Sequence, residues 1–130
     1  MQGHGKTDYI PPIQDDFKDI EHHMLHFLEN HDEQRIASPD FAGSAAKGKP
    51  AMVVSATIST SPTLLYFAQE VGEAGEEQAG FGSPTRTSIF DYVGVPTLQR
   101  WVNNKKFNGG QSTKEEKALR DFYKRLLNFT

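Results

Sequence analysis

The sequence predicts an α/β fold in which about two parallel strands are flanked by helices and carry a long loop. An apolar run, residues 24–28, ends abruptly in polar residues, and a second run, 63–67, follows later in the chain. Buried parallel strands have this short, nearly continuous apolar pattern. Between the runs, 51–60 fits a helix, and the interval from 24 to 67 exceeds the roughly 30 residues that a strand–helix–strand unit needs. The predicted order is therefore strand, helix, parallel strand.

Composition and charge limit the classes of function. The chain has 130 residues, 36% hydrophobic and 24% charged, which suits a single domain over 1–130. A net charge of -3 and a pI near 5.9 argue against a nucleic-acid partner. Without cysteine there is no disulfide or thiolate chemistry. No apolar run reaches the roughly 18 residues of a membrane span. The first residues lack the apolar core of a signal peptide, so secreted, periplasmic and cytoplasmic locations all stay open.

The N-terminal part is expected to be a loop that leads into a short helix. Residues 1–14 are glycine-rich and then carry two consecutive prolines, which do not fit a helix interior. Asp15 or Asp16 fits the N-cap of the helix that follows. His22 and His26 would share a face of that helix, as two metal ligands do. Surface or partly buried histidines are the simpler interpretation, so we predict no metal site and no cofactor in this chain.

The middle of the chain supplies the predicted helix and the second strand. Pro50 suits the first turn of a helix. Residues 51–60 are apolar on nearly every side, as expected of a helix packed against a sheet, although their β-branched residues leave a strand open. Residues 63–67 then form a clearer strand. The next stretch, 71–101, is first glycine-rich and acidic and then rich in apolar groups, and we expect a long loop that folds over the strand ends.

The C-terminal segment predicts an amphipathic helix. Ser112 followed by Glu115 fits a capping box, in which each side chain satisfies a backbone N–H of the first turn. The apolar positions beyond it recur at helical spacing and form one stripe: Ala118, Leu119, Phe122, Tyr123, Leu126 and Leu127. Such a helix needs a surface to cover.

Three segments together resemble a known family. Residues 27–32 read Phe-Leu-Glu-Asn-His-Asp, 63–70 read Thr-Leu-Leu-Tyr-Phe-Ala-Gln-Glu, and 117–129 follow as a helix. They resemble the seventh strand, eighth strand and eighth helix of the α-amylase family of glycoside hydrolases, with Ala68 where glycine is usual. The resemblance implies a partial TIM (β/α)8 barrel, namely the C-terminal quarter of a catalytic domain, acting on an α-1,4-glucan or maltooligosaccharide. It allows for calcium in a full-length family member.

The resemblance also implies residue roles. Asp32 resembles the carboxylate that hydrogen-bonds sugar hydroxyls and stabilises the transition state, and His31 resembles a neighbouring sugar-hydroxyl donor. Asn30, Arg35 and Glu70 are placed as supports, with a role as surface ion-pair residues about equally plausible. Trp101, Tyr92 and Phe81 fit the small core of the long loop better than a stacking surface for sugars.

The chain does not contain a complete catalytic pair. Glycoside hydrolysis needs two carboxyls about 5 to 9.5 Å apart. On a strand, Glu29 and Asp32 would lie roughly 10 Å apart on opposite sides. The sequence therefore predicts part of an α-glucan hydrolase. The nucleophile and the general acid are absent, so it stays open whether this chain alone is an enzyme, and the full-length protein is expected to be a retaining α-glycosidase. The alternatives are a transglycosylase fragment, a non-catalytic glucan-binding or interaction module, and an unrelated small α/β protein. Two strands would also leave free edges, so we expect self-association.

Overall fold

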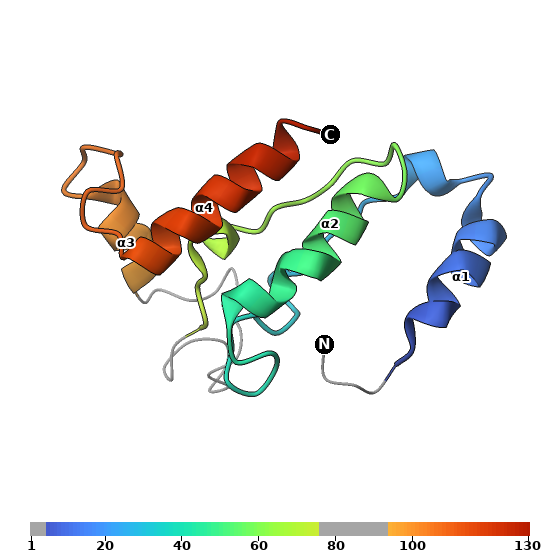
Figure 1. The fold of residues 1–130 in the computed structure, drawn as a ribbon, viewed down its shortest axis with the longest axis horizontal. Helices are drawn as coiled ribbons and strands as arrows, with labels where there is room; N and C mark the ends of the chain where they lie inside the picture. The colour runs from blue at the N-terminus through green and yellow to red at the C-terminus, as the bar shows by residue number, and fades with distance from the viewer. Residues whose placement is uncertain (1–4, 76–93) are drawn as a thin grey trace.

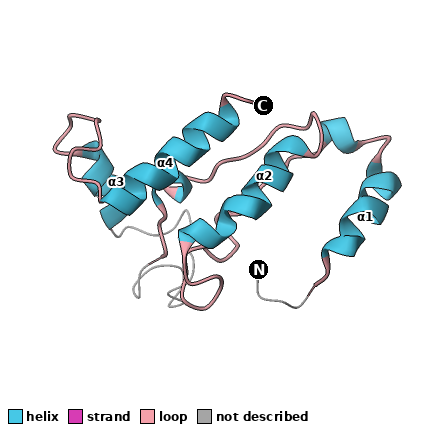
Figure 2. Ribbon diagram, in the orientation of Figure 1, coloured by secondary structure: helices cyan, strands magenta, loops and turns pink. Residues whose placement is uncertain are grey.

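Helices make up the regular structure of the described residues. The computed structural model describes residues 5–75 and 94–130, and Figure 2 shows helices and loops but no strand in these ranges. The α-helices are α1 (Ile10–Phe17), α2 (Lys49–Thr57), α3 (Pro96–Val102) and α4 (Lys114–Leu127). Short 3-10 helices lie between them: η1 (Thr7–Tyr9), η2 (Glu21–His23), η3 (Ala45–Gly48) and η4 (Gln69–Val71). Figure 1 places α2 between α1 and α4, with α3 beside the start of α4.

The predicted sheet is absent from the described residues, so the α/β fold and the partial TIM barrel are wrong. The two predicted strands do run side by side, but only one parallel bridge joins them, between His26 and Thr63. Its hydrogen bonds run from the His26 N–H to the Pro62 carbonyl at 2.9 Å and from the Leu64 N–H to the His26 carbonyl at 2.7 Å. The side chain of Leu25 is 50% exposed, so the first apolar run is not a buried strand. A pair of strands with no further neighbour is marginal in water.

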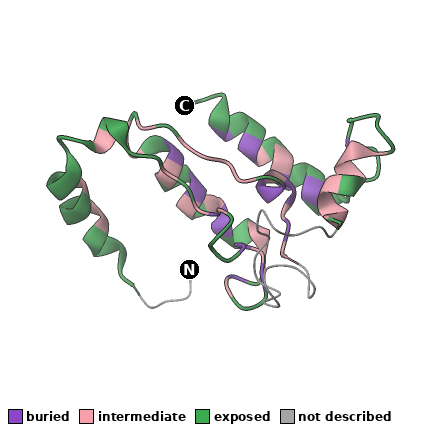
Figure 3. Cartoon of the chain, turned by 180° about the vertical axis from the view of Figure 1, so that it is seen from behind, coloured by how far each residue is buried: buried purple, intermediate pink, exposed green. Residues whose placement is uncertain are grey.

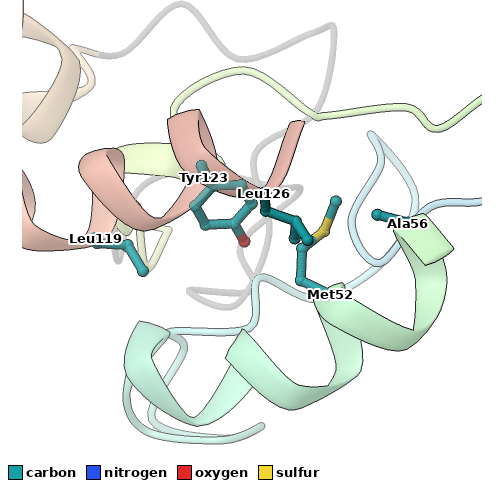
Figure 4. Close-up of a cluster of buried hydrophobic side chains, with 5 residues drawn as sticks. All are labelled: Met52, Ala56, Leu119, Tyr123 and Leu126. Atoms are coloured by element: carbon teal, nitrogen blue, oxygen red, sulfur yellow. The ribbon is translucent and has the colours of Figure 1, made fainter. Parts of the chain in front are cut away.

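The helix predicted over 51–60 is confirmed as α2, and Pro50 stands in its first turn. Helices α2 and α4 form the main apolar cluster, which Figure 4 shows with side chains from both helices pointing toward each other. Its members are Met52, Ala56, Leu119, Tyr123 and Leu126. Leu119, Tyr123 and Leu126 of the predicted apolar stripe therefore pack on α2 instead of a sheet. Ala118 and Leu127 of the same stripe are exposed.

The N-cap of α4 lies one residue later than predicted. The Thr113 hydroxyl accepts from the Glu116 N–H at 3.2 Å, and the Glu116 carboxylate accepts from the Thr113 N–H at 2.9 Å. Ser112 and Glu115 have the same spacing, but the Ser112 N–H donates to the Gly109 carbonyl at 3.1 Å and so belongs to the preceding turn. Because two overlapping pairs fit the capping pattern, the sequence alone does not choose between them.

Helix α1 covers a segment that was predicted to be a loop. It begins at Ile10, so both prolines lie in its first turn, where a missing N–H costs no helical hydrogen bond. None of its residues is buried, and Ile13 and Phe17 are 52% and 42% exposed. Figure 3 shows this contrast, because buried residues gather on α2 and α4 while α1 is largely exposed.

The long loop predicted over 71–101 ends in a helix. Val95 precedes α3 in an extended conformation and Pro96 opens the helix. Phe81 and Tyr92, which were predicted to belong to the small core of this loop, lie outside the described residues. With no sheet edge in the described ranges, the argument for self-association through strand edges no longer applies. Within those ranges, no helix has the length and apolar character to cross a membrane.

Candidate functional site

Most of the predicted site residues lie in one loop, 29–36, whose two ends are tied together. We call Glu29, Arg35 and Ile36 the loop neck, and residues 30–34 the loop tip. Arg35 Nη1 donates to Glu29 Oε2 at 2.8 Å, and the Ile36 N–H donates to Glu29 Oε1 at 2.7 Å. The side chains of Glu29 and Arg35 are 2% and 0% exposed. A single carboxylate therefore closes the loop from inside the protein.

Arg35 also connects the loop neck to the second apolar segment. Its Nη2 donates to the Phe67 carbonyl at 2.8 Å. Its guanidinium carbon lies 4.7 Å from the centre of the Tyr66 ring and 4.9 Å from the centre of the Phe67 ring. Rings next to a buried guanidinium stabilise its charge. The loop neck thus joins positions that are 32 residues apart in the chain.

Burial governs the acidity of Glu29. Removal from water raises the pKa of this carboxyl, and the Arg35 charge and the Ile36 N–H lower the pKa only in part. Both oxygens already accept hydrogen bonds within the loop neck. Glu29 is therefore not available to act on a ligand together with Asp32.

The loop tip has the opposite character. Asn30 Oδ1 accepts from the N–H groups of Asp32 and Glu33, both at 2.8 Å, which is the arrangement of an Asx turn. His31 Nε2 lies 3.2 Å from Asp32 Oδ2, and these side chains are 47% and 74% exposed. An exposed pair of this kind adds little stability, about 0 to 1 kcal/mol. The loop tip therefore presents an imidazole and a carboxylate to solvent on a turn with a defined backbone.

The structure brings four of the five predicted site residues together. Asn30, His31, Asp32 and Arg35 share loop 29–36, whereas Glu70 lies on η4. Glu70 lies near the Tyr123 hydroxyl, since its charge contributes to the raised pKa of that group. The roles assigned to these residues toward a sugar stay predictions.

Sequence reasoning missed a buried polar group beneath the loop neck, which consists of the side chains of Gln69 and Tyr123. Gln69 Nε2 donates to the Tyr123 hydroxyl at 3.1 Å, and Gln69 Oε1 accepts from the Tyr66 N–H at 3.1 Å. Burial raises the pKa of Tyr123 to about 12, with the Gln69 hydrogen bond opposing and the charges of Glu29 and Glu70 adding to the rise. The sequence feature that could have revealed buried polar residues is a polar side chain directly after an apolar run, as at Glu29 and Gln69.

Ala68 precedes this buried glutamine in a conformation that usually belongs to glycine. Its φ of 61° and ψ of 7° are left-handed, and the residue is 2% exposed. The Phe67 carbonyl beside it accepts from Arg35. The chain thus turns sharply where it meets the loop neck.

His26 is engaged in the fold at both ring nitrogens. Nδ1 lies 2.9 Å from the Ser55 carbonyl oxygen, and Nε2 lies 2.9 Å from Glu21 Oε1. The Ser59 hydroxyl is the largest cause that lowers the pKa of Glu21, and hydrogen bonds from Gln14 and His26 act in the same direction. The His22 ring instead contacts the His23 ring, with the two centres 3.9 Å apart and the planes tilted by 43°. Among the residues that the structure describes, no group of three or more His, Asp or Glu side chains could hold a metal ion.

Comparisons with known proteins give no match. No family model, no curated protein and no solved structure is similar to this chain. Together with the absence of a sheet from the described ranges, this overturns the resemblance to the α-amylase family. The glycoside-hydrolase and TIM-barrel assignments fall with it, because the strand pair on which they depended is a single bridge.

Proposed function

We propose that this chain is a non-catalytic carbohydrate-binding module that binds an α-1,4-glucan or maltooligosaccharide through the loop tip. One observation supports the proposal above all. The Asp32 carboxylate and the His31 imidazole lie side by side and exposed on a turn, while the ends of that turn are fixed by a buried ion pair. Polar groups that are held in place before a ligand arrives lose little conformational freedom on binding.

The chemistry of the loop tip suits sugar hydroxyls. Each hydroxyl is both a donor and an acceptor, so a carboxylate and an imidazole together offer one complementary partner for each role. The Phe67 ring contacts Arg35 of the loop neck and is 40% exposed, which adds an aromatic surface at the base of the loop. The resemblance that suggested an α-glucan is overturned, so the titration below decides between an α-glucan and other carbohydrates.

The same geometry favours binding without bond cleavage. Glycoside hydrolysis needs two carboxyls that face one bond. Glu29, the nearest acid considered in the sequence, is buried and has both oxygens engaged.

Isothermal titration of residues 1–130 with maltoheptaose tests the proposal, with cellohexaose as the β-linked comparison. We expect saturable binding of maltoheptaose that weakens about tenfold or more in Asp32→Asn, because hydrogen bonds to charged groups contribute about 1.5–3 kcal/mol. Glu33→Gln is the matched control, since it removes the same charge from the same exposed loop tip. Circular dichroism checks that each variant folds.

Three results would contradict the proposal. The first is no saturable heat with maltoheptaose, and the second is unchanged affinity in Asp32→Asn. The third is the release of new reducing ends from starch by this chain alone, since that would show a catalytic pair. Equal binding of both oligosaccharides would retain carbohydrate binding and reject the α-glucan preference.

A further inference from the structure

The N-terminal helix carries an apolar stripe that stays exposed to solvent in the single chain (Figure 3). Tyr9, Ile13 and Phe17 are spaced at i, i+4 and i+8 along η1 and α1, so they share one helix face. Ile20 follows in a turn, in which its N–H donates to the Phe17 carbonyl at 2.9 Å. All four side chains are more than 40% exposed. We call these four residues the α1 stripe.

Helix α1 needs a surface to pack on. It has eight residues, and isolated helices shorter than about 12–15 residues are marginal in water. None of its residues is buried, so packing within the chain supplies little of the stability that it requires. Contiguous exposed apolar groups on a protein surface mark contact sites for other molecules. We therefore expect a partner to cover the α1 stripe.

A groove of suitable character lies along the C-terminal half of α4. We call it the α4 groove, and its volume is about 490 Å³. Leu65 and Leu127 give its walls apolar surface. Arg120 and Lys124 contribute positive charge, with Glu70 as the opposing acid. The groove therefore suits an apolar helix face that is flanked by acids.

The α1 stripe and the α4 groove belong to parts of the chain with opposite charge. Residues 8–21 contain five acids and one lysine, whereas residues 117–130 contain four basic residues and one acid. Asp16 on α1 and Lys124 in the groove are both exposed. Opposite charges on two surfaces steer the surfaces together and fix their mutual orientation. Charge complementarity thus matches the α1 stripe to the α4 groove.

The two surfaces of one chain lie apart, because α2 stands between α1 and α4 (Figure 1). We propose that the α1 stripe of one copy docks in the α4 groove of a second copy of this chain. The contact has an apolar centre and a charged rim, as protein interfaces do. Since each copy offers both surfaces, the contact closes into a ring or repeats from copy to copy. The proposal does not depend on carbohydrate binding at the loop tip.

Gel filtration with multi-angle light scattering tests this proposal on residues 1–130 over a series of protein concentrations. We expect the mass to rise from the 14.5 kDa of one chain to at least twice that value. Phe17→Ser should raise the concentration at which association begins about tenfold or more, because it removes an aromatic ring from the apolar centre. Val53→Ser is the matched control, since Val53 is a similarly exposed apolar residue on α2, and it should change nothing.

Two charge-reversal variants distinguish a second copy from any other occupant. Asp15→Lys with Asp16→Lys makes the flank of α1 basic, and Lys124→Glu with Arg125→Glu makes the side of α4 acidic. Each variant alone should stay a monomer, because like charges then face each other. An equimolar mixture should associate, because the basic α1 of the first variant fits the acidic α4 of the second.

Lys105→Glu with Lys106→Glu is the matched control for charge, since it reverses two exposed charges outside the α4 groove. It should associate as the original chain does, and circular dichroism checks that each variant folds. A mass of 14.5 kDa at every concentration would overturn the proposal. So would a mixture of the two charge-reversal variants that stays monomeric, or unchanged association in Phe17→Ser. Loss of association in the lysine control would also contradict it.

Discussion

Two ion pairs in the same short loop differ in almost every physical respect. Glu29 and Arg35 at the loop neck are nearly inaccessible to water, and each makes a further hydrogen bond to the backbone. His31 and Asp32 at the loop tip are largely solvated. The comparison shows that two ion pairs of similar residue types, a few positions apart, can contribute very differently to stability. The contribution of a charged pair depends on how far it is buried more than on which residues form it.

Loss of the buried pair should cost more stability than loss of the exposed pair. Removing one partner of a buried pair leaves an uncompensated charge and costs about 3–5 kcal/mol, whereas an exposed pair contributes about 0–1 kcal/mol. The loop neck should therefore govern stability and the loop tip should govern ligand contact. The first and the last of the four predictions below test this division, and the other two concern Tyr123 and Ala68, which lie outside loop 29–36.

Arg35→Ala should destabilise the protein by about 3–5 kcal/mol, because Glu29 would stay buried without its counter-charge and the Phe67 carbonyl would lose its donor. Urea denaturation followed by circular dichroism measures the loss. Asp32→Ala is the control, with an expected change within about 0.5 kcal/mol. Similar losses for both variants would mean that the loop neck and the loop tip do not divide stability and ligand contact in this way.

Alkaline pH should lower the stability of the fold through Tyr123, which belongs to the buried polar group beneath the loop neck. The pKa of Tyr123 rises from 10.0 to about 12 in the fold, so between these values the folded state keeps a proton that the unfolded state has lost. Stability therefore falls as pH rises through this window, by about 2–3 kcal/mol in all. Urea midpoints from pH 9 to 12 measure the slope, and Tyr123→Phe should reduce it. A slope that persists in Tyr123→Phe would assign the effect to other groups.

Ala68→Gly should stabilise the fold by up to about 1 kcal/mol. A left-handed residue with a Cβ costs about 1–2 kcal/mol, and the greater freedom of glycine in the unfolded chain offsets part of the gain. Thermal melting measures the shift. Ala42→Gly serves as the control, because Ala42 is buried without a positive φ and its change should destabilise. A lower melting temperature in Ala68→Gly would show that the Ala68 methyl group contributes more than its strain costs.

Asp32→Asn should have the smallest effect on stability, within about 0.5 kcal/mol, because the side chain is 74% exposed and its pair with His31 is weak. The same urea titration measures it. Added salt should leave the difference between this variant and the original chain close to zero. A loss above about 1 kcal/mol would place Asp32 among the residues that hold the loop together.

The elements that the sequence predicted correctly are the helices whose apolar residues pack on another helix. Helices α2 and α4 carry periodic apolar positions, and these pack on each other. Residues 24–28 are equally apolar but gain only one bridge, so Leu25 and Phe27 stay exposed. Periodicity shows which side of a segment is apolar but not what covers that side. That information lies in long-range packing, which a single sequence does not display.

The candidate site was predicted in part for the same reason. The dense polar cluster after an apolar run marked Asn30, His31 and Asp32 as ligand-contacting groups at the end of a buried strand, whereas the structure places them on an exposed turn. Arg35 was predicted to be a support that pairs charge, but its partner was missed, because Glu29 was considered only as a second carboxylate for Asp32.

The ion pair of the loop neck also makes the loop tip a natural place for insertion. Because Glu29 and Arg35 hold the two ends of the loop in register, the number of residues between them is not fixed by the core. Doubling a flexible loop costs only about 0.6 kcal/mol in closure entropy. A peptide placed between Glu33 and Gln34, both exposed, would be displayed from a fixed base. The buried arginine thus gives this small protein one position where its length can change while its core stays the same.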